Sequence, residues 1–147
     1  MKQTLKIMII NDSEEVLNLF YEILHEEEGH EVVLCSYRVR DLDELRLIAP
    51  DLLIVDQVYG NESAGWKLIQ KIRMSRDIAS LPIVFCSTDL RRVQELEGHL
   101  AAMNIVSVIK PFDVDTLINA VNEAWRIRNK TSRVQSIPSD GPATPAD

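Results

Sequence analysis

Polar side chains that can accept or bind a phosphoryl group follow several short apolar runs of this sequence. An ionised carboxylate is a nucleophile that can form an acyl phosphate, and a lysine ammonium or a serine hydroxyl can stabilise phosphoryl oxygens. Two carboxylates close together would repel each other unless a cation offset their charge, and Mg²⁺ prefers such oxygen ligands. We therefore single out Asp56, Ser87 and Lys110 as candidate reactive residues, and Asp12 and Asp56 as candidate Mg²⁺ ligands.

These residues would meet only if the apolar runs are strands of one parallel sheet. Apolar composition predicts strands at residues 5–10, 31–35, 52–55, 83–86 and 105–109. Helical spacing of apolar residues predicts helices at about 13–28, 42–48, 65–74, 90–100 and 114–128. This alternation predicts an α/β fold in which a doubly wound, five-stranded parallel sheet is covered by five helices. The carboxyl ends of such strands share one edge of the sheet, where ligands bind.

Local signals indicate where the first helix begins and ends. The spacing of Asp12 and Glu15 is that of a capping box, and Gly29 offers a C-terminal stop. Asp12 could accordingly be no more than a helix cap, and Thr88, or less readily Ser87 at the end of its strand, could play the same role for the fourth helix.

Composition is that of a globular protein with one domain. The chain has 147 residues, of which 46% are apolar and 27% charged, and no apolar run reaches the ~20 residues of a membrane helix. We expect a domain over residues 1–128 and a flexible tail over 129–147, which is rich in Pro, Ser and Thr. The net charge of −7 argues against nucleic acid and anionic membranes as partners, because both attract basic surfaces. The N-terminus lacks the pattern of a secretion signal, so a cytoplasmic location is expected.

Cysteine and histidine side chains are predicted to have structural roles. Cys35 and Cys86 lie among apolar residues without the spacing of a metal site, which favours burial as small hydrophobic residues. His25, His30 and His99 lie apart on predicted helices or loops, and we expect them at the surface.

Five short stretches together resemble the response-regulator receiver domain of two-component signalling, of the stand-alone chemotaxis type. The resemblance covers about residues 5–128. The matching stretches are IIND at 9–12, PDLLIVD at 50–56, Gly65, PIVFCST at 82–88 and KPF at 110–112. Their order and their placement at strand ends make the combination specific, although each stretch alone is weak.

The resemblance implies a flavodoxin-like fold with strand order 2-1-3-4-5 and a signalling switch rather than a metabolic enzyme. A histidine kinase or phosphotransfer protein would phosphorylate Asp56 in a Mg²⁺-dependent step. Asp12 and the backbone carbonyl of Val58 would complete the protein ligands of Mg²⁺. Lys110 would contact the phosphoryl group, and Ser87 would move inward. The phosphorylated form would bind a downstream target protein, and a homodimer is possible.

Two departures from the family pattern leave an alternative function open. Asn11 replaces the first acidic residue of the usual pair; it could still accept a hydrogen bond from a metal-bound water, but Mg²⁺ affinity should fall. Ser107 replaces the aromatic residue that commonly reports activation. The alternative is therefore a receiver-like interaction module that is not phosphorylated. A nucleotide- or flavin-binding protein is disfavoured, since neither GxGxxG nor a P-loop is present.

Overall fold

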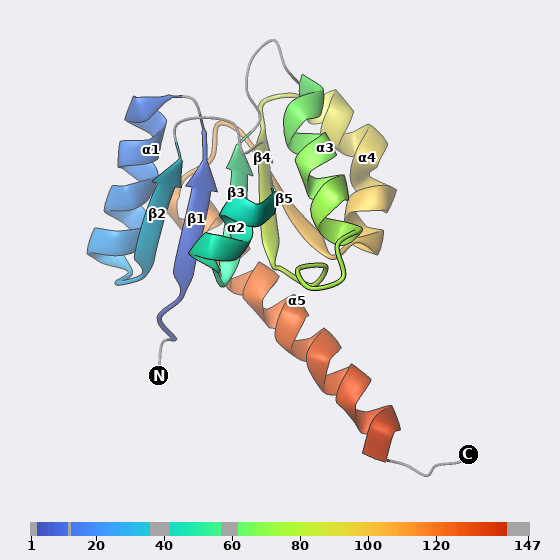
Figure 1. Ribbon diagram of the computed structural model, residues 1–147. Coiled ribbons are helices and arrows are strands. Elements are labelled where there is room, and N and C mark those ends of the chain that lie inside the picture. The colour runs from blue at the N-terminus through green and yellow to red at the C-terminus, as the bar shows by residue number, and fades with distance from the viewer. Residues whose placement is uncertain (1–2, 12, 36–41, 57–61, 141–147) are drawn as a thin grey trace.

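Five apolar segments form a parallel sheet in the computed structural model of the protein (Figure 1). The structure describes residues 3–11, 13–35, 42–56 and 62–140, apart from the side chains of 62–64, 92, 96 and 129–140. The strands are β1 (Lys6–Ile10), β2 (Glu31–Cys35), β3 (Leu52–Asp56), β4 (Ile83–Ser87) and β5 (Ile105–Ile109). Their order is β2-β1-β3-β4-β5, and every neighbouring pair is parallel. The predicted fold class and strand order are confirmed.

Six helical segments, one more than predicted, connect the strands in the described part of the chain. They are α1 (Glu14–Tyr21), η1 (Glu22–Glu27), α2 (Leu42–Ile48), α3 (Glu62–Arg73), α4 (Leu90–Ala102) and α5 (Val114–Asp140). The difference arises because the first predicted helix changes to a π-helix, η1, over its last turns. The Glu28 N–H accordingly donates to the Ile23 carbonyl, five residues earlier, at 3.1 Å. Gly29, with a φ of 80°, then ends the helix as predicted.

The N-terminus of α1 is capped by a different residue from the one predicted. Ser13 is the N-cap, and its hydroxyl oxygen accepts a hydrogen bond from the Val16 N–H at 3.3 Å. The capping-box interpretation of Asp12 and Glu15 is therefore wrong by one position, because Ser13 also has the side-chain oxygen that a cap requires. Asp12 itself lies outside the described residues.

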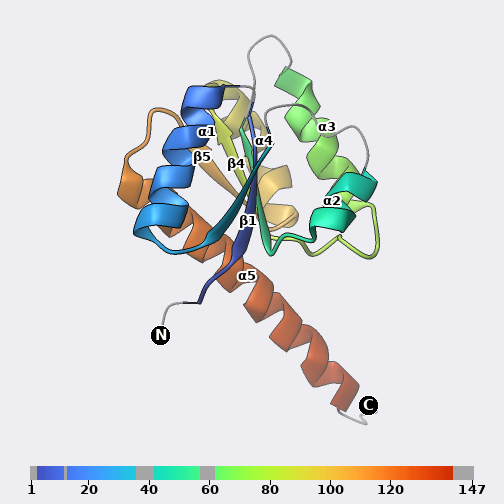
Figure 2. The same cartoon turned by 60° about the vertical axis from the view of Figure 1, so that its left-hand side comes forward.

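Two apolar cores cover the two faces of the sheet. The helices α1 and α5 pack on one face, and α2, α3 and α4 pack on the other (Figures 1 and 2). Alternate residues of each strand supply the two cores: in β1, for example, Ile7 and Ile9 face α1 and α5, whereas Met8 and Ile10 face the other helices. Burial on both faces explains why β3 and β4 read as continuous apolar runs.

Helix α5 continues past the end that the sequence predicted. It was expected to stop near Arg128, whereas its backbone is helical to Asp140 and projects away from the sheet (Figures 1 and 2). No glycine or proline interrupts residues 114–137, so nothing in the local sequence stops the helix earlier. The domain boundary at residue 128 and the flexible tail remain predictions, and residues 141–147 lie outside the described part.

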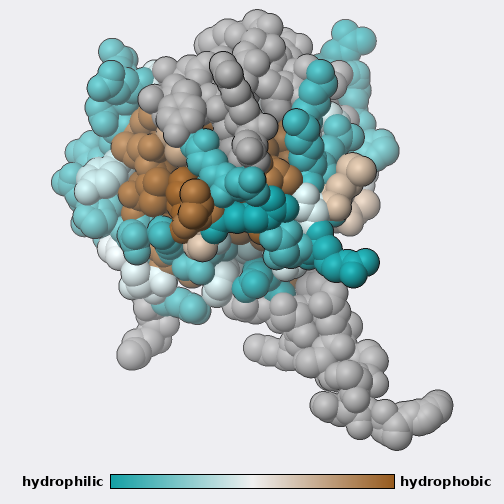
Figure 3. All heavy atoms as spheres, viewed as in Figure 1, coloured by the Kyte–Doolittle hydropathy of each residue, from teal (hydrophilic) through white to brown (hydrophobic). Residues whose placement is uncertain are grey.

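The edge strand β2 leaves apolar surface on one side of the molecule. Val32 and Val33 are only half-buried, and Leu34 is 36% exposed. Figure 3 shows apolar residues gathered on the side where β1 and β2 lie in Figure 1. Among the helices of the described residues, none combines the length and apolar character that crossing a bilayer demands.

The cysteines are buried as predicted, but one of the histidines is not at the surface. Cys35 and Cys86 are free thiols in the core, and burial raises the pKa of the Cys86 thiol. His25 and His99 are exposed. His30 is only 4% exposed, and its Nδ1 accepts a hydrogen bond from the Leu5 N–H at 3.1 Å. The prediction was wrong for His30 because this long-range contact leaves no periodic signal in the sequence.

Arg73, the last residue of α3, forms hydrogen bonds with the segments that lead into β4 and β5. The Arg73 guanidinium donates hydrogen bonds to the backbone carbonyls of Met103 at 2.9 Å, Ala79 at 3.1 Å and Leu81 at 2.8 Å. Burial lowers the pKa of Arg73 to about 10. These hydrogen bonds give a donor to carbonyl groups just before β4 and β5, which would otherwise need water as a partner.

An Arg73→Met variant is expected to have a free energy of unfolding about 2–4 kcal/mol lower than the wild type, because the variant leaves three partly buried carbonyls without their donor. Chemical denaturation followed by circular dichroism measures the change. Arg126→Met is a matched control, since Arg126 is exposed and pairs only with the nearby Glu123 among the described residues. The control should shift stability by less than about 0.5 kcal/mol. Equal shifts in the two variants would contradict a structural role for Arg73.

Candidate functional site

The carboxyl ends of four strands bring polar residues to one edge of the sheet. Asn11 follows β1, Asp56 ends β3, Ser87 ends β4, and Lys110 follows β5. In register, Asp56 lies opposite Cys86, the residue before Ser87. The Lys110 N–H donates to the Ser87 carbonyl at 2.8 Å, which places Lys110 at the same edge. The predicted convergence is therefore present for these residues, while Asp12 and Val58 lie outside the described part of the chain.

Asp56 and Lys110 form a close ion pair at this edge. The Lys110 Nζ atom lies 2.5 Å from Asp56 Oδ2, to which it donates a hydrogen bond, and 2.5 Å from Oδ1. Asp56 is only 2% exposed as a residue, whereas the Lys110 side chain is 22% exposed. The lysine therefore reaches from the partly solvated rim down to a buried carboxylate.

Asn11 makes a second hydrogen bond to the same carboxylate. Its amide Nδ2 donates to Asp56 Oδ2, and its amide oxygen accepts from the Ser13 N–H at 2.5 Å. The two partners fix the orientation of the amide, because a carboxylate needs a donor and a backbone N–H needs an acceptor. The nitrogen, not the oxygen, therefore faces Asp56. Sequence reasoning placed Asn11 at the site but missed this direct bond, for which the strand-end position was the only signal.

The electrostatic balance at Asp56 remains incomplete. Burial raises the pKa of the Asp56 carboxyl, and the hydrogen bonds and charge supplied by Lys110 and Asn11 only partly offset this rise. Burial therefore disfavours the negative charge more than its neighbours stabilise it. A further cation beside Asp56 would complete the balance.

A cation fits the donor set of this site through Asp56. Its Oδ1 atom is buried and accepts no hydrogen bond from the described residues, despite the nearby Lys110 charge. A carboxylate oxygen of this kind is a suitable ligand for a hard divalent ion such as Mg²⁺. Within the described residues, no group of three or more His, Cys, Asp and Glu side chains could hold a metal. The further protein ligands that the family pattern suggests, Asp12 and the Val58 carbonyl, lie outside the described residues.

Ser87 and Ser107 differ sharply in environment. Ser87 is 1% exposed, and its hydroxyl oxygen accepts a hydrogen bond from the Asp89 N–H at 3.0 Å, just before α4 begins. Ser107 lies on β5 and is exposed. Ser87 thus joins the end of β4 to the start of α4, which agrees in part with the sequence alternative of a capping role.

A Ser87→Ala variant is expected to lower the free energy of unfolding by about 1 kcal/mol, because the Asp89 N–H loses its acceptor. Urea denaturation measures the change. Ser75→Ala serves as a control, since the Ser75 hydroxyl donates only to the Lys71 carbonyl near the end of α3 among the described residues. A loss for Ser87→Ala no larger than that for the control would show that the Ser87 hydrogen bond contributes nothing of its own.

Sequence comparison adds the decisive observation. A sequence model of the response regulator receiver domain matches residues 7–122, well over half of the chain. The chain belongs to the response-regulator receiver family. The match begins inside β1, includes the other four strands of this receiver domain and ends inside α5, before the projecting part of that helix. A search of curated protein sequences finds no significant match.

Solved structures share the receiver fold with this chain. It is similar to NtrX from Brucella abortus in complex with ADP, with a TM-score of 0.74, 23% identity and coverage of 92% of this chain. It is also similar to the chemotaxis response regulator CheY4 of Vibrio cholerae, with a TM-score of 0.68, 20% identity and coverage of 83% of this chain and 99% of that one. A sensor protein from Polaromonas sp. JS666 is similar as well, with a TM-score of 0.71, 22% identity and coverage of 84% of this chain and 97% of that one. The receiver spans only 30% of the NtrX chain, and at these identities the likeness establishes the fold alone.

Proposed function

We propose that this receiver is a phosphoacceptor response regulator that takes a phosphoryl group on Asp56 from a histidine kinase or phosphotransfer protein. The resulting change would be read as altered binding of a downstream target protein. Family membership supports the class of function. The observation that carries the choice of residue is the buried Asp56 carboxylate, which is held by Lys110 and Asn11 at the ligand-binding edge of the sheet.

The proposed step is a displacement at phosphorus. A carboxylate oxygen of Asp56 forms a bond to phosphorus, the bond between phosphorus and the donor nitrogen of the kinase histidine breaks, and the histidine keeps the electron pair of that bond. Lys110 lies within reach to balance the charge that is added, because its Nζ atom is already 2.5 Å from both carboxylate oxygens. Asn11, at the end of the neighbouring strand β1, donates a hydrogen bond that holds the carboxylate in one orientation.

Mg²⁺ is the cofactor that we propose for this site, held by Asp56 and, from the family pattern, by Asp12 and the Val58 carbonyl. When bound, it would neutralise phosphoryl oxygens that Lys110 alone cannot neutralise. The family pattern also suggests that the Ser87 hydroxyl contacts the phosphoryl group. To do so, Ser87 would have to redirect a hydroxyl that now lies next to the Asp89 N–H. Movement of the β4–α4 connection is therefore the proposed first consequence of phosphorylation.

The test is whether the intact chain gains one phosphoryl group from acetyl phosphate in the presence of MgCl₂. Mass spectrometry of the wild type should show the gain, and removal of Mg²⁺ with a chelator should suppress it. Asp56→Asn should abolish it, since an amide is not a nucleophile of this kind. Asp51→Asn is a matched control, because Asp51 is exposed and directly precedes the first residue of β3, whereas Asp56 is the last.

The same experiment separates the proposed function from the alternative. No mass gain in the wild type with acetyl phosphate or with phosphorylated kinase would favour an interaction module that does not accept a phosphoryl group. An undiminished gain in Asp56→Asn would show that another residue is the acceptor.

A further inference from the structure

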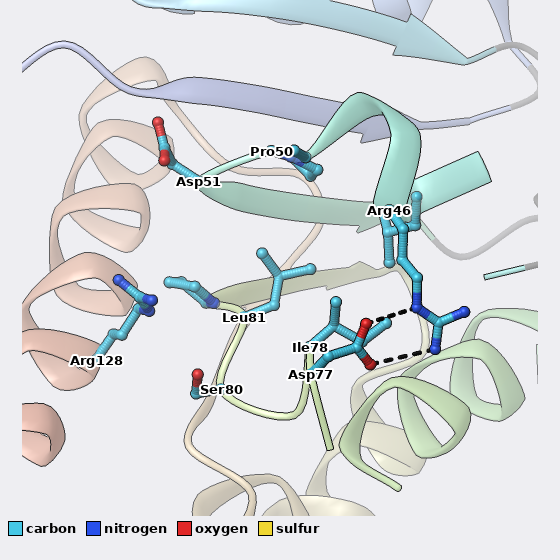
Figure 4. Close-up of a pocket in the computed structure, with 11 residues that line it drawn as sticks. Arg46, Pro50, Asp51, Asp77, Ile78, Ser80, Leu81 and Arg128 are labelled. Atoms are coloured by element: carbon cyan, nitrogen blue, oxygen red, sulfur yellow. Dashed lines mark hydrogen bonds and ion pairs between the residues drawn. The ribbon is translucent and has the colours of Figure 1, made fainter. Parts of the chain in front are cut away.

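A cavity lies at the opposite edge of the sheet from Asp56. Its volume is about 270 Å³, and it opens beside the segments that lead into β3 and β4. Its apolar lining comes from Leu45, Ala49, Pro50, Ile78, Leu81 and Pro82. Figure 4 shows Pro50, Ile78 and Leu81 among these residues. Leu45 and Leu81 are buried, so part of the wall belongs to the core of the domain. The volume suits a small molecule, since pockets for drug-sized ligands begin at roughly 300 Å³.

Three of the charged groups around this cavity already have partners. Arg46 donates from Nε to Asp77 Oδ2 at 2.7 Å and from NH1 to Asp43 Oδ1 at 2.9 Å. Figure 4 shows the Arg46–Asp77 pair on one side of the cavity. Asp51 accepts a hydrogen bond from the Lys6 N–H at 2.8 Å, and it is exposed to solvent. The Arg46 charge is therefore already paired with two carboxylates, whereas Asp51 keeps its negative charge, hydrogen-bonded to a backbone N–H and exposed to solvent.

Arg128 is different, because no carboxylate of the described residues forms an ion pair with it. Its guanidinium lies over the Trp125 ring, 5.6 Å from the ring centroid, and the indole N–H of Trp125 donates to Gln3 at 3.2 Å. The Arg128 Nε atom is buried and has no hydrogen-bond acceptor among the residues that the structure describes. A buried donor without an acceptor costs about 1–3 kcal/mol, so an acceptor supplied from outside the described residues would stabilise the site.

We propose that this cavity binds a small organic carboxylate with a short apolar body. The carboxylate would accept from the Arg128 guanidinium, whose fork of donors matches two carboxylate oxygens. The apolar body would lie against Leu81, Ile78 and Leu45, and the small volume limits it to a few carbon atoms. The site is separate from the phosphoacceptor edge. Its ligand would link α5, which carries Arg128, to the segment before β4, which carries Leu81.

The test uses isovalerate as the probe and the ¹⁵N- and methyl-labelled full chain in an NMR titration. Isovalerate is expected to shift the methyl signals of Leu45, Ile78 and Leu81 in a saturable manner. Arg128→Gln should weaken binding by roughly tenfold or more, because it removes the charged donors. Arg126→Gln is the matched control, since Arg126 lies on the same helix and is paired with Glu123, and it should leave the affinity unchanged.

Two further probes and one further variant keep the test decisive. Isovaleramide lacks the charge, and inorganic phosphate lacks the apolar body, so each should bind at least roughly tenfold more weakly than isovalerate. If Arg128→Gln does not fold, Ser80→Phe, which places a bulky ring at the cavity lining, should abolish the shifts instead. Equal binding of the amide would overturn the role of Arg128, and equal binding of phosphate would overturn the role of the apolar wall. Absence of saturable shifts with isovalerate would overturn the site itself.

Discussion

A Lys110→Met variant is expected to lose about 2–3 kcal/mol of unfolding free energy near neutral pH, because it leaves the buried Asp56 charge without its cation. Breaking a fully buried pair costs more, but the Lys110 side chain is 22% exposed and water screens part of its interaction. Transfer of a phosphoryl group from acetyl phosphate should also slow by about 100-fold, since a charge that stabilises the phosphoryl oxygens is removed. Denaturant unfolding and mass spectrometry measure the two effects.

The loss of stability in Lys110→Met should depend on pH in a defined direction. The pKa of Asp56 is already raised by burial, and removing Lys110 raises it further. A carboxyl whose pKa is higher in the folded than in the unfolded state destabilises the fold only at a pH where the ionised form is populated. The loss relative to the wild type is therefore complete above the folded-state pKa of the variant, shrinks as the pH falls towards the lower folded-state pKa of the wild type, and vanishes below that wild-type value, because the unfolded state is the same in both proteins.

Two controls show whether the effect belongs to the ion pair. The double variant Lys110→Met with Asp56→Asn should recover most of the lost stability, because no buried charge remains. Lys71→Met removes an exposed lysine of α3 and should change stability by less than about 0.5 kcal/mol. A penalty that is independent of pH, or that persists in the double variant, would mean that Lys110 acts through packing alone.

An Asn11→Asp variant is expected to bind Mg²⁺ roughly tenfold or more tightly than the wild type, because affinity for this ion rises with the number of charged oxygen ligands. Without Mg²⁺ the variant should be about 2–4 kcal/mol less stable, since it loses the N–H donor to Asp56 and places a second carboxylate beside it. The acceptor for the Ser13 N–H is kept, because aspartate retains an oxygen at that position.

The measurement for Asn11→Asp is the free energy of unfolding as a function of Mg²⁺ concentration, which needs no phosphorylation. Bound ion should restore the lost stability in the variant at lower concentrations than are needed to stabilise the wild type. Asn11→Ala is the control: it removes the same donor without adding charge, so its Mg²⁺ dependence should not exceed that of the wild type. An unchanged Mg²⁺ response in Asn11→Asp would show that position 11 does not face the ion.

The elements of this receiver could be predicted well because their signals are local. A strand buried on both faces must be a short apolar run, and a helix on a sheet must repeat apolar residues at helical spacing. The predicted bounds of β2, β5 and α2 agree with the structure. The bounds of α1 and α5 were less accurate, because Ser13 competed with Asp12 as the cap and no residue before Pro138 marked a stop.

The candidate site was predicted in outline and not in detail. Strand-end position was enough to bring Asp56 and Lys110 together, since parallel strands end at a common edge. It could not show that the amide nitrogen of Asn11 faces Asp56, because that orientation depends on the Ser13 N–H as well as on a residue 45 positions away. The roles predicted for Asp12 and Val58 stay predictions, since both lie outside the described residues.

By itself, the sequence determined the order of strands and helices, the family to which the chain belongs and the edge of the sheet where its reactive residues gather. Only the tertiary structure decided which polar groups meet: Asn11 with Asp56, His30 with the Leu5 backbone, and Arg128 with a cavity instead of a carboxylate. The physical reason is the distance along the chain over which each kind of interaction acts. Periodicity and turn chemistry act over a few residues, whereas a hydrogen bond or an unpaired charge depends on neighbours that the fold brings from elsewhere in the chain.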